Sequence, residues 1–186
     1  DHRDLHSFPT RRSSDLNNRA NYVQKSLTLF GDSTPFKMYL PIKISQPPAD
    51  SYAVLYMCGG IQINLQASGQ IDCLARSGLS DNPYWDIMWT VLIPSNIVNL
   101  NQELIGVVEW TGTQYILGYI KDGVYTNVNT INSTLSPNSS TVFDIGRNQY
   151  IPPAYTGSID LNAFKIYVYG DLVYQPCLKI PYTESF

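Results

Sequence analysis

Apolar and polar residues alternate along much of this chain, and the alternation predicts β-strands. In residues 36–44, every second position is apolar, which gives an extended strand one apolar face: Phe36, Met38, Leu40, Ile42 and Ile44. Further strands are predicted at 52–58, 61–67, 70–76, 87–93, 104–110, 114–121, 124–131, 142–146, 158–169 and 172–175. No stretch combines a helical period with helix caps. The pattern therefore predicts an all-β protein.

Turn-forming residues separate the predicted strands. Asp122-Gly123 is the strongest hairpin signal, and Ser68-Gly69 is read as another tight turn. Pro41 has no backbone N–H, so its strand is expected to lie at a sheet edge or to carry a local break. Phe164 and Leu161 differ in parity, which predicts a bulge or bend near residues 162–163. Many short strands joined by such turns are typical of an antiparallel β-sandwich or barrel.

Composition narrows the class of protein. Charged residues make up 15% of the chain, tyrosine is abundant and the formal net charge is −3, which suits a virion or extracellular β-domain. Without a basic patch, nucleic acid is not an expected partner. No apolar run reaches the roughly 18 residues needed for membrane insertion. Cys58 and Cys73 could pair across neighbouring strands, although buried reduced thiols are the favoured interpretation, and Cys177 makes the number odd.

The first residues do not resemble a natural protein sequence. Residues 1–16 resemble a translated sequencing adapter and contain both histidines, His2 and His6. We therefore expect an adapter-derived segment at 1–16, an unassigned N-terminal segment at 17–35, a β-sandwich at 36–176 and a C-terminal tail at 177–186. Function is accordingly sought from residue 17 onward.

Three motifs in the C-terminal half resemble a known superfamily. They are Val-Glu-Trp-Thr-Gly-Thr-Gln-Tyr-Ile-Leu at 108–117 with Asp-Gly-Val-Tyr at 122–125, Phe-Asp-Ile-Gly-Arg-Asn at 143–148, and Gly-Ser-Ile-Asp-Leu-Asn-Ala-Phe-Lys-Ile at 157–166 with Leu-Val-Tyr at 172–174. Together they are similar to the concanavalin A-like lectin/glucanase superfamily, in the laminin G-like form of phage tail and other structural proteins. The resemblance implies a jelly-roll sandwich.

Several catalytic designs are missing from the sequence. Beyond the adapter-like segment there is no histidine, which excludes Ser-His-Asp catalysis and histidine-bound zinc in their usual forms. Glucanases of the superfamily resemble one another in a Glu-x-Asp-x-x-Glu strand, and no such motif occurs here. Glu109 has no acidic neighbour and is expected to be an outward-facing strand residue. We therefore expect no enzyme, and a divergent glycoside hydrolase is the least favoured function.

Two polar loops with aromatic residues are the candidate sugar-binding sites. The first contributes Tyr84, Trp85 and Asp86, and the second Asn148, Tyr150 and Tyr155. Each aromatic residue could equally cap the core. Calcium is a possible ligand of the first loop, with Asp81 and Asp86 supplying oxygens. Trp89 and Trp110 lie on predicted strands and are expected in the core.

These features lead to two hypotheses. The first is a non-catalytic carbohydrate-binding or adhesion domain of a phage tail or virion-surface protein, which contacts cell-surface glycans. The second is a structural virion assembly or decoration module, which binds other virion subunits. Because fold alone does not determine function, glycan binding is what separates the two.

Overall fold

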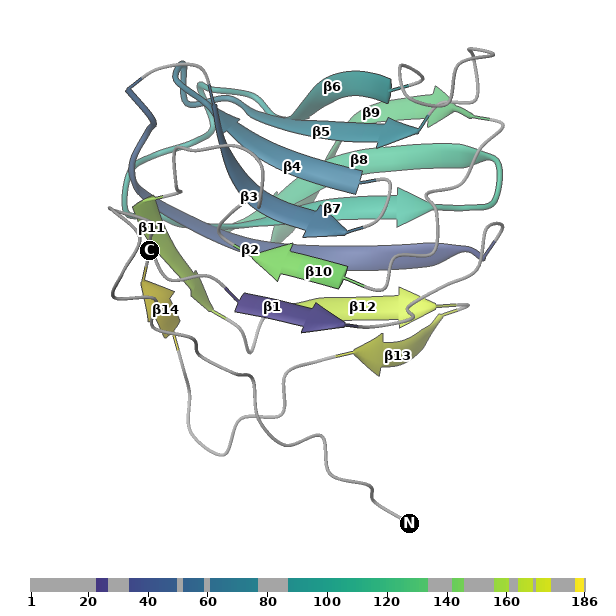
Figure 1. Cartoon of the computed structure of the whole chain (residues 1–186). Coiled ribbons are helices and arrows are strands. Elements are labelled where there is room, and N and C mark those ends of the chain that lie inside the picture. Colours follow the sequence, from purple (N-terminus) through teal and green to yellow (C-terminus); the bar gives the residue numbers. More distant parts are fainter. Residues whose placement is uncertain are drawn as a thin grey trace.

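The structure is a computed structural model that describes residues 23–26, 34–49, 52–58, 61–76, 87–133, 142–145, 156–160, 164–168, 170–174 and 183–185. These residues form strands and turns, and every strand pairing is antiparallel. Two sheets pack face to face as a jelly-roll-like β-sandwich (Figure 1). The predicted all-β antiparallel fold is confirmed. In the ranges described, no helix is long and apolar enough to cross a membrane.

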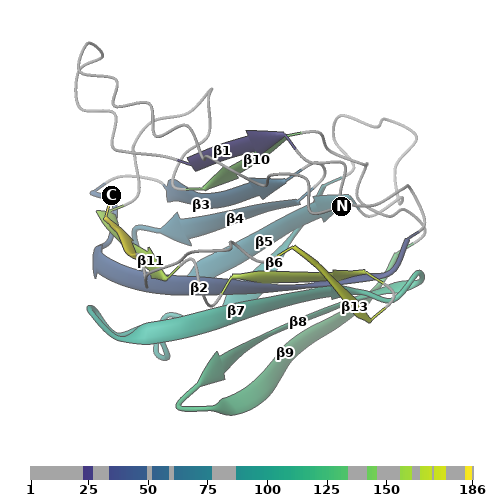
Figure 2. The same cartoon turned by 90° about the horizontal axis from the view of Figure 1, so that it is seen from below.

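The smaller sheet has six strands in the order β1-β10-β3-β4-β5-β6. Their bounds are β1 Val23–Ser26, β10 Val142–Ile145, β3 Tyr52–Cys58, β4 Ile61–Gln66, β5 Ile71–Arg76 and β6 Ile87–Ile93. Strands β3 to β6 follow one another as a meander, whereas β10 comes from much later in the chain and lies between β1 and β3. Figure 2 shows this sheet as one of two layers.

The larger sheet has the strand order β13-β12-β2-β7-β8-β9. In addition, β11 pairs with β2, and β14 pairs with β11. Its strands are β2 Phe36–Gln46, β7 Glu103–Trp110, β8 Gln114–Lys121, β9 Val124–Asn132, β11 Thr156–Asp160, β12 Lys165–Val168, β13 Asp171–Tyr174 and β14 Thr183–Ser185. Strand β2 is long and lies in the interior of the sheet, which makes its outward-facing residues central to that face.

Pro41 shows how an interior strand accommodates proline. On one side β2 pairs with β7 along most of its length. On the other side β12 pairs with the first half of β2 and β11 with the second half, and neither pairing includes Pro41. The Pro41 carbonyl accepts a hydrogen bond from the Tyr56 hydroxyl across the sandwich. The expected edge position is therefore wrong, and the expected break lies in the neighbouring strands, where a missing N–H removes no ladder bond.

The single strand predicted at 158–169 is two strands. Strand β11 ends at Asp160 and β12 begins at Lys165, and they pair with different parts of β2. Phe164 and Ile166 are fully buried, while residues 161–163, where a bulge was expected, lie outside the described residues.

The core lies between the two sheets and follows the predicted alternation. All five apolar residues of β2 named above are buried, and the inward residues of β4 and β5 face them: Ile61, Ile63, Leu65, Ile71, Cys73 and Ala75. Trp110 is buried against Tyr115, with 4.7 Å between the ring centroids. The prediction of a core position for Trp89 is wrong, because 53% of this residue is exposed.

Two local predictions concern a turn and a thiol. Asp122 and Gly123 both have positive φ, 52° and 78°, as a two-residue type I′ hairpin requires. Cys73 is a free, buried cysteine, and burial together with the charge of Asp72 raises the pKa of its thiol to about 12. In register it lies opposite Ile63, whereas Cys58 lies opposite Ile61 on the far side of β4. The two cysteines are therefore not on neighbouring strands.

Candidate functional site

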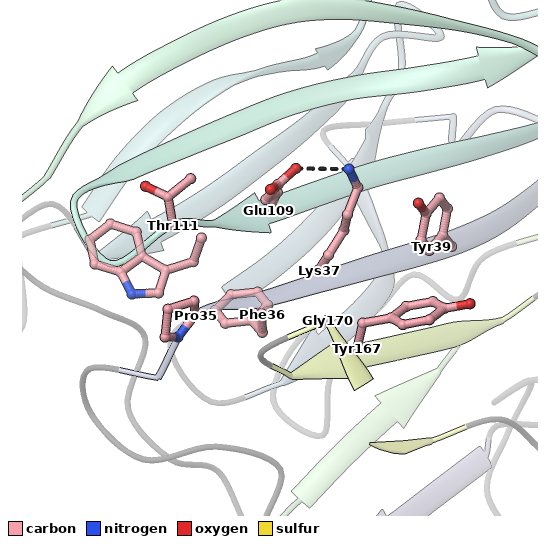
Figure 3. A pocket seen from close by; sticks show the side chains of 9 residues that line it. Pro35, Phe36, Lys37, Tyr39, Glu109, Thr111, Tyr167 and Gly170 are labelled. Carbon is pink, nitrogen blue, oxygen red and sulfur yellow. Dashed lines mark ion pairs between the residues drawn. The ribbon is translucent and has the colours of Figure 1, made fainter. Parts of the chain in front are cut away.

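A hollow of about 450 Å³ lies on the outer face of the larger sheet (Figure 3). Residues from β2, β7 and β12 and from the segments next to them line it: Pro35, Phe36, Lys37, Tyr39, Glu109, Trp110, Thr111, Tyr167 and Gly170. It lies across several strands of the open face, and its rim combines charged and aromatic side chains. A groove of this kind suits an extended ligand better than a compact one.

Strand alternation and register place the charged residues of the groove. Since Phe36 and Met38 face the core, Lys37 between them faces outward. Lys37 lies opposite Glu109 of β7 on one side and opposite Tyr167 of β12 on the other. Its ammonium nitrogen is 2.8 Å from a carboxylate oxygen of Glu109, and the two side chains are 34% and 30% exposed. Glu109 faces outward, as predicted, and serves as the partner of a half-buried cation.

Tyrosine rings surround the ammonium group. Lys37 Nζ lies 5.9 Å from the ring centroids of both Tyr39 and Tyr125. Tyr39 meets Tyr167 edge to face, with 5.8 Å between centroids and an interplanar angle of 74°. A cation within about 6 Å of an aromatic ring centroid is attracted by the ring quadrupole. We call these five residues, Lys37, Tyr39, Glu109, Tyr125 and Tyr167, the Lys37 site.

Gly118 allows Tyr125 to reach this site from β9. Tyr125 pairs with Ile120 at the edge of the sheet, with β8 between β9 and the strand that carries Glu109. A Cβ on Gly118 would lie 2.9 Å from the Tyr125 hydroxyl and 3.0 Å from its ring, and only 2.3 Å from the carbonyl oxygen of Thr126. Only glycine leaves this space free. The tyrosine therefore lies across Gly118, toward Lys37.

Charge and burial shift two pKa values in this site. Burial by itself would lower the pKa of Lys37, but the hydrogen bond and charge of Glu109, aided by Tyr39 and Tyr125, raise it above 10.5. Burial raises the pKa of Tyr125 above 10.0, and the opposing effect of Lys37 does not cancel this. At neutral pH the site therefore holds an ammonium ion and a tyrosine hydroxyl that keeps its proton.

These groups have distinct chemical abilities. The ammonium ion can bind a carboxylate, the Glu109 carboxylate can accept a proton, and the Tyr125 hydroxyl can donate one. The rings of Tyr39 and Tyr167 offer apolar surface for the C–H faces of a sugar. Among the described residues that line the hollow, Glu109 alone carries a carboxylate.

The site residues predicted from the sequence fall in segments that the structure does not describe. Tyr84, Trp85 and Asp86 are outside the described residues, as are Asp81 and the second set, Asn148, Tyr150 and Tyr155. For calcium, no cluster of three or more acidic, cysteine or histidine side chains suited to a metal occurs in the described ranges.

Sequence reasoning missed Lys37, Tyr39, Tyr125 and Tyr167. For Lys37 and Tyr39 the alternation carried a signal, since they occupy the outward positions of a strand whose other positions are apolar.

Comparisons with known proteins were made by sequence and by structure. No family model and no curated protein matches the chain. Among solved structures, the chain is similar to an alginate lyase from Alteromonas sp.272 (7% identity, TM-score 0.42, 70% of this chain covered), to the alginate lyase from Klebsiella pneumoniae (13%, 0.40, 62%) and to polysaccharide lyase family 18 aly-SJ02 (8%, 0.41, 70%). The chain spans 61%, 51% and 62% of their respective lengths.

These neighbours correct two expectations from the sequence. A non-catalytic adhesion domain of a phage or virion, and a chain that is not an enzyme, were expected; the similar solved structures are polysaccharide lyases instead. The missing histidine and the missing Glu-x-Asp-x-x-Glu strand exclude particular catalytic designs only. They leave open catalysis by lysine, glutamate and tyrosine, which β2, β7 and β9 bring together.

Proposed function

We propose that the Lys37 site binds an acidic polysaccharide and cleaves it by β-elimination. The observation that carries the proposal is the position of the Lys37 ammonium, 2.8 Å from Glu109 and next to the rings of Tyr39 and Tyr125 on an open sheet face. The residues that line the hollow come from three neighbouring strands and the segments next to them, so a polymer can lie across these strands.

A uronate unit suits the charges of the site. Its carboxylate replaces Glu109 as the partner of Lys37, and an ammonium–carboxylate contact in a half-buried site is stronger than one in bulk water. The C–H faces of the sugar rings pack on Tyr39 and Tyr167, which lie edge to face beside the cation. A neutral polysaccharide would leave the ion pair in place and gain only the ring contacts.

Elimination suits the site better than hydrolysis. Glycoside hydrolysis generally needs two carboxyl groups, whereas among the described residues of the lining only Glu109 supplies one. Elimination needs a group that stabilises the negative charge of the substrate carboxylate, a base and an acid. Lys37, Glu109 and Tyr125 provide these three functions.

The proposed β-elimination is balanced in electrons and protons. Displaced from Lys37, Glu109 takes the proton from the carbon next to the substrate carboxylate. The electron pair of that C–H bond forms a C=C bond, and the glycosidic C–O bond breaks with its electrons on the leaving oxygen. Tyr125 donates its proton to that oxygen, and proton transfer from Glu109 to Tyr125 restores the site. Because its pKa is raised, Tyr125 carries the required proton at neutral pH.

The test measures cleavage by the purified full chain. It is incubated with alginate and with polygalacturonate, and both the ultraviolet absorbance of the unsaturated uronate and the number of reducing ends are followed. We expect the two signals to rise together. Glu109→Gln and Lys37→Met should each lower kcat/KM by about 100-fold or more, as the loss of a general base or a charge-stabilising group does.

The same strands offer a matched control. Lys43 and Glu103 are also paired in register on β2 and β7 but lie outside the groove lining, so Lys43→Met and Glu103→Gln should leave the rate within about twofold. New reducing ends without absorbance would replace elimination by hydrolysis. A folded chain that cleaves neither polymer, or whose activity survives Glu109→Gln, would contradict the proposal.

A further inference from the structure

The outer face of the smaller sheet carries a large exposed ring. Trp89 lies on β6 opposite Leu74 of β5, on the face away from the core, and 53% of it is exposed. An indole on a strand of a sandwich loses favourable burial when it faces water, at a cost of about 25 cal/mol for each Å² of apolar surface left exposed. Exposed apolar surface marks a binding site where neighbouring residues extend it, so the surroundings of this ring decide its role.

Hydrogen bonds fix the orientation of the Trp89 ring. Its Nε1–H donates to Asp72 Oδ2 at 2.7 Å, and Gln70 Nε2 donates to the other oxygen of the same carboxylate at 2.7 Å. Asp72 is only 3% exposed, so this bond is shielded from water. The indole is therefore held in one position by a buried acceptor that is itself held by Gln70.

A second ring extends the surface. Tyr52 of β3 meets Trp89 edge to face, with 6.1 Å between centroids and an interplanar angle of 87°. Strands β4 and β5 lie between the strands that carry the two residues, so both side chains reach inward over the sheet. We call Tyr52, Gln66, Gln70, Asp72 and Trp89 the Trp89 platform.

Amide groups surround the rings. Gln66 lies opposite Tyr52 in register, and its Nε2 is a buried donor without an acceptor in the described structure. Gln66 as a whole is partly exposed, and rotation about the last bond of its side chain exchanges the positions of the amide nitrogen and oxygen. A ligand hydroxyl would supply the missing acceptor, which favours a hydroxyl-bearing ligand over a purely apolar one.

Charge selects the kind of sugar. Asp72 is the charged member of the platform, and its carboxylate lies at the edge of the Trp89 ring, against the indole N–H. A uronate or sulfated sugar stacked on this ring would be repelled by that carboxylate, whereas a neutral pyranose would not. The C–H face of a neutral pyranose matches an indole, and its hydroxyls match the glutamine amides.

We propose that the Trp89 platform is a second carbohydrate site, which binds neutral polysaccharide chains on the side of the sandwich opposite to the Lys37 site. Trp89 is the contact residue, and Asp72 is a positioning residue that acts through the indole. The inference does not depend on cleavage at the Lys37 site, because it concerns another face and an uncharged ligand.

Affinity electrophoresis of the full chain tests the platform. Native gels contain hydroxyethylcellulose, galactomannan or mixed-linkage glucan, and a gel with alginate is run beside them. We expect retardation by at least one neutral polymer. Trp89→Ala should weaken this binding by about tenfold or more, as truncation of a central aromatic contact does. Trp89→Phe keeps a ring but loses the N–H that Asp72 holds, so it should weaken binding less, by about fivefold.

Two further variants test whether binding is specific to the platform. Leu100→Ala removes another exposed apolar side chain, 55% exposed, and should leave retardation unchanged. Glu109→Gln should abolish cleavage of acidic polymers but not retardation by neutral ones, so the two proposals can fail separately. The proposal is overturned if no neutral polymer retards the folded chain or if Trp89→Ala is retarded equally. It is also overturned if the only effect of Trp89→Ala is to convert a dimer into a monomer in sedimentation.

Discussion

The two outer faces of this sandwich are built by the same alternation but carry different chemistry. On the larger sheet, Lys37 and Glu109 form an ion pair, and two tyrosine ring centroids lie 5.9 Å from the Lys37 ammonium. On the smaller sheet, the Asp72 carboxylate is buried at the edge of the Trp89 ring and orients the ring without facing the ligand. One face exposes its charges to a ligand, whereas the other conceals its charge and exposes a ring.

This difference in the exposure of charged groups shows how one sheet face can carry out catalysis while the other only binds a ligand. Groups that must exchange protons with a substrate have to lie in the groove and remain partly accessible, as the ion pair does. Groups that only orient a ring can be buried, since a buried acceptor holds its donor more firmly. The predictions that follow test this division.

The largest expected effect concerns the proton donor of the groove. Tyr125→Phe removes the hydroxyl but keeps the ring beside Lys37, so kcat should fall by about 100-fold while KM changes little. Tyr167→Phe is the matched change at a ring without an assigned proton transfer and should leave kcat within about threefold. Initial rates over a range of alginate concentrations give both constants. Equal losses in the two variants would remove the distinction between them.

Gly118 tests whether the groove depends on a close backbone approach. Gly118→Ala places a methyl group 2.3 Å from the Thr126 carbonyl and 2.9 Å from the Tyr125 hydroxyl. We expect the free energy of unfolding to fall by about 1–3 kcal/mol, as for overpacked sites, and cleavage to fall about tenfold because Tyr125 is displaced. Urea denaturation and rate measurements check this, with exposed Thr130→Ala on β9 as the control. An unchanged rate would mean that Tyr125 does not need its present position.

A change at Asp72 tests whether a buried carboxylate orients the Trp89 ring for ligand binding. Asp72→Ala keeps the indole but removes the acceptor of its N–H, so the ring is no longer held in one orientation. Binding of neutral polysaccharide should therefore weaken about fivefold. Cleavage of acidic polysaccharide on the other face should not change. Affinity electrophoresis and the absorbance assay, run on the same preparation, give both results. A loss of cleavage would link the two faces and contradict their independence.

The smallest expected effect is on stability. The Lys37–Glu109 pair should contribute about 0.2–1 kcal/mol, measured by a double-mutant cycle, and less at high salt because the pair is partly exposed. The pKa of Lys37 is raised in the folded chain, so its contribution is complete below the unfolded value of 10.5 and is lost as pH rises through the folded value.

The raised pKa of Tyr125 acts in the same direction, with the contribution present below 10.0 and lost at higher pH. As pH rises above 10.0, the wild type should therefore lose more stability than Lys37→Met, as measured by urea unfolding. The same loss in both chains would show that other groups dominate the alkaline transition.

Much of the fold could be predicted because its signals are local. Strand β2 begins at Phe36 as its alternation predicts, and the Asp122-Gly123 turn has the backbone that its residues favour. Trp89 was placed wrongly because an aromatic residue on a strand reads as core, and the alternation of β6 does not reveal that Asp72 holds the ring on the outer face. The position of Pro41 was also misjudged, since the neighbours of β2 come from distant parts of the chain.

The sequence by itself determined which residues form strands and which face of each strand is apolar, because a period of two depends only on neighbouring residues. It also determined which catalytic designs are missing. Only the tertiary structure decided that Lys37 pairs with Glu109 and that Tyr125 packs against Gly118. It also decided that the Trp89 N–H donates to Asp72. Strand pairing decides these contacts, and pairing between distant segments follows from how two sheets close over a shared core, which no local pattern records.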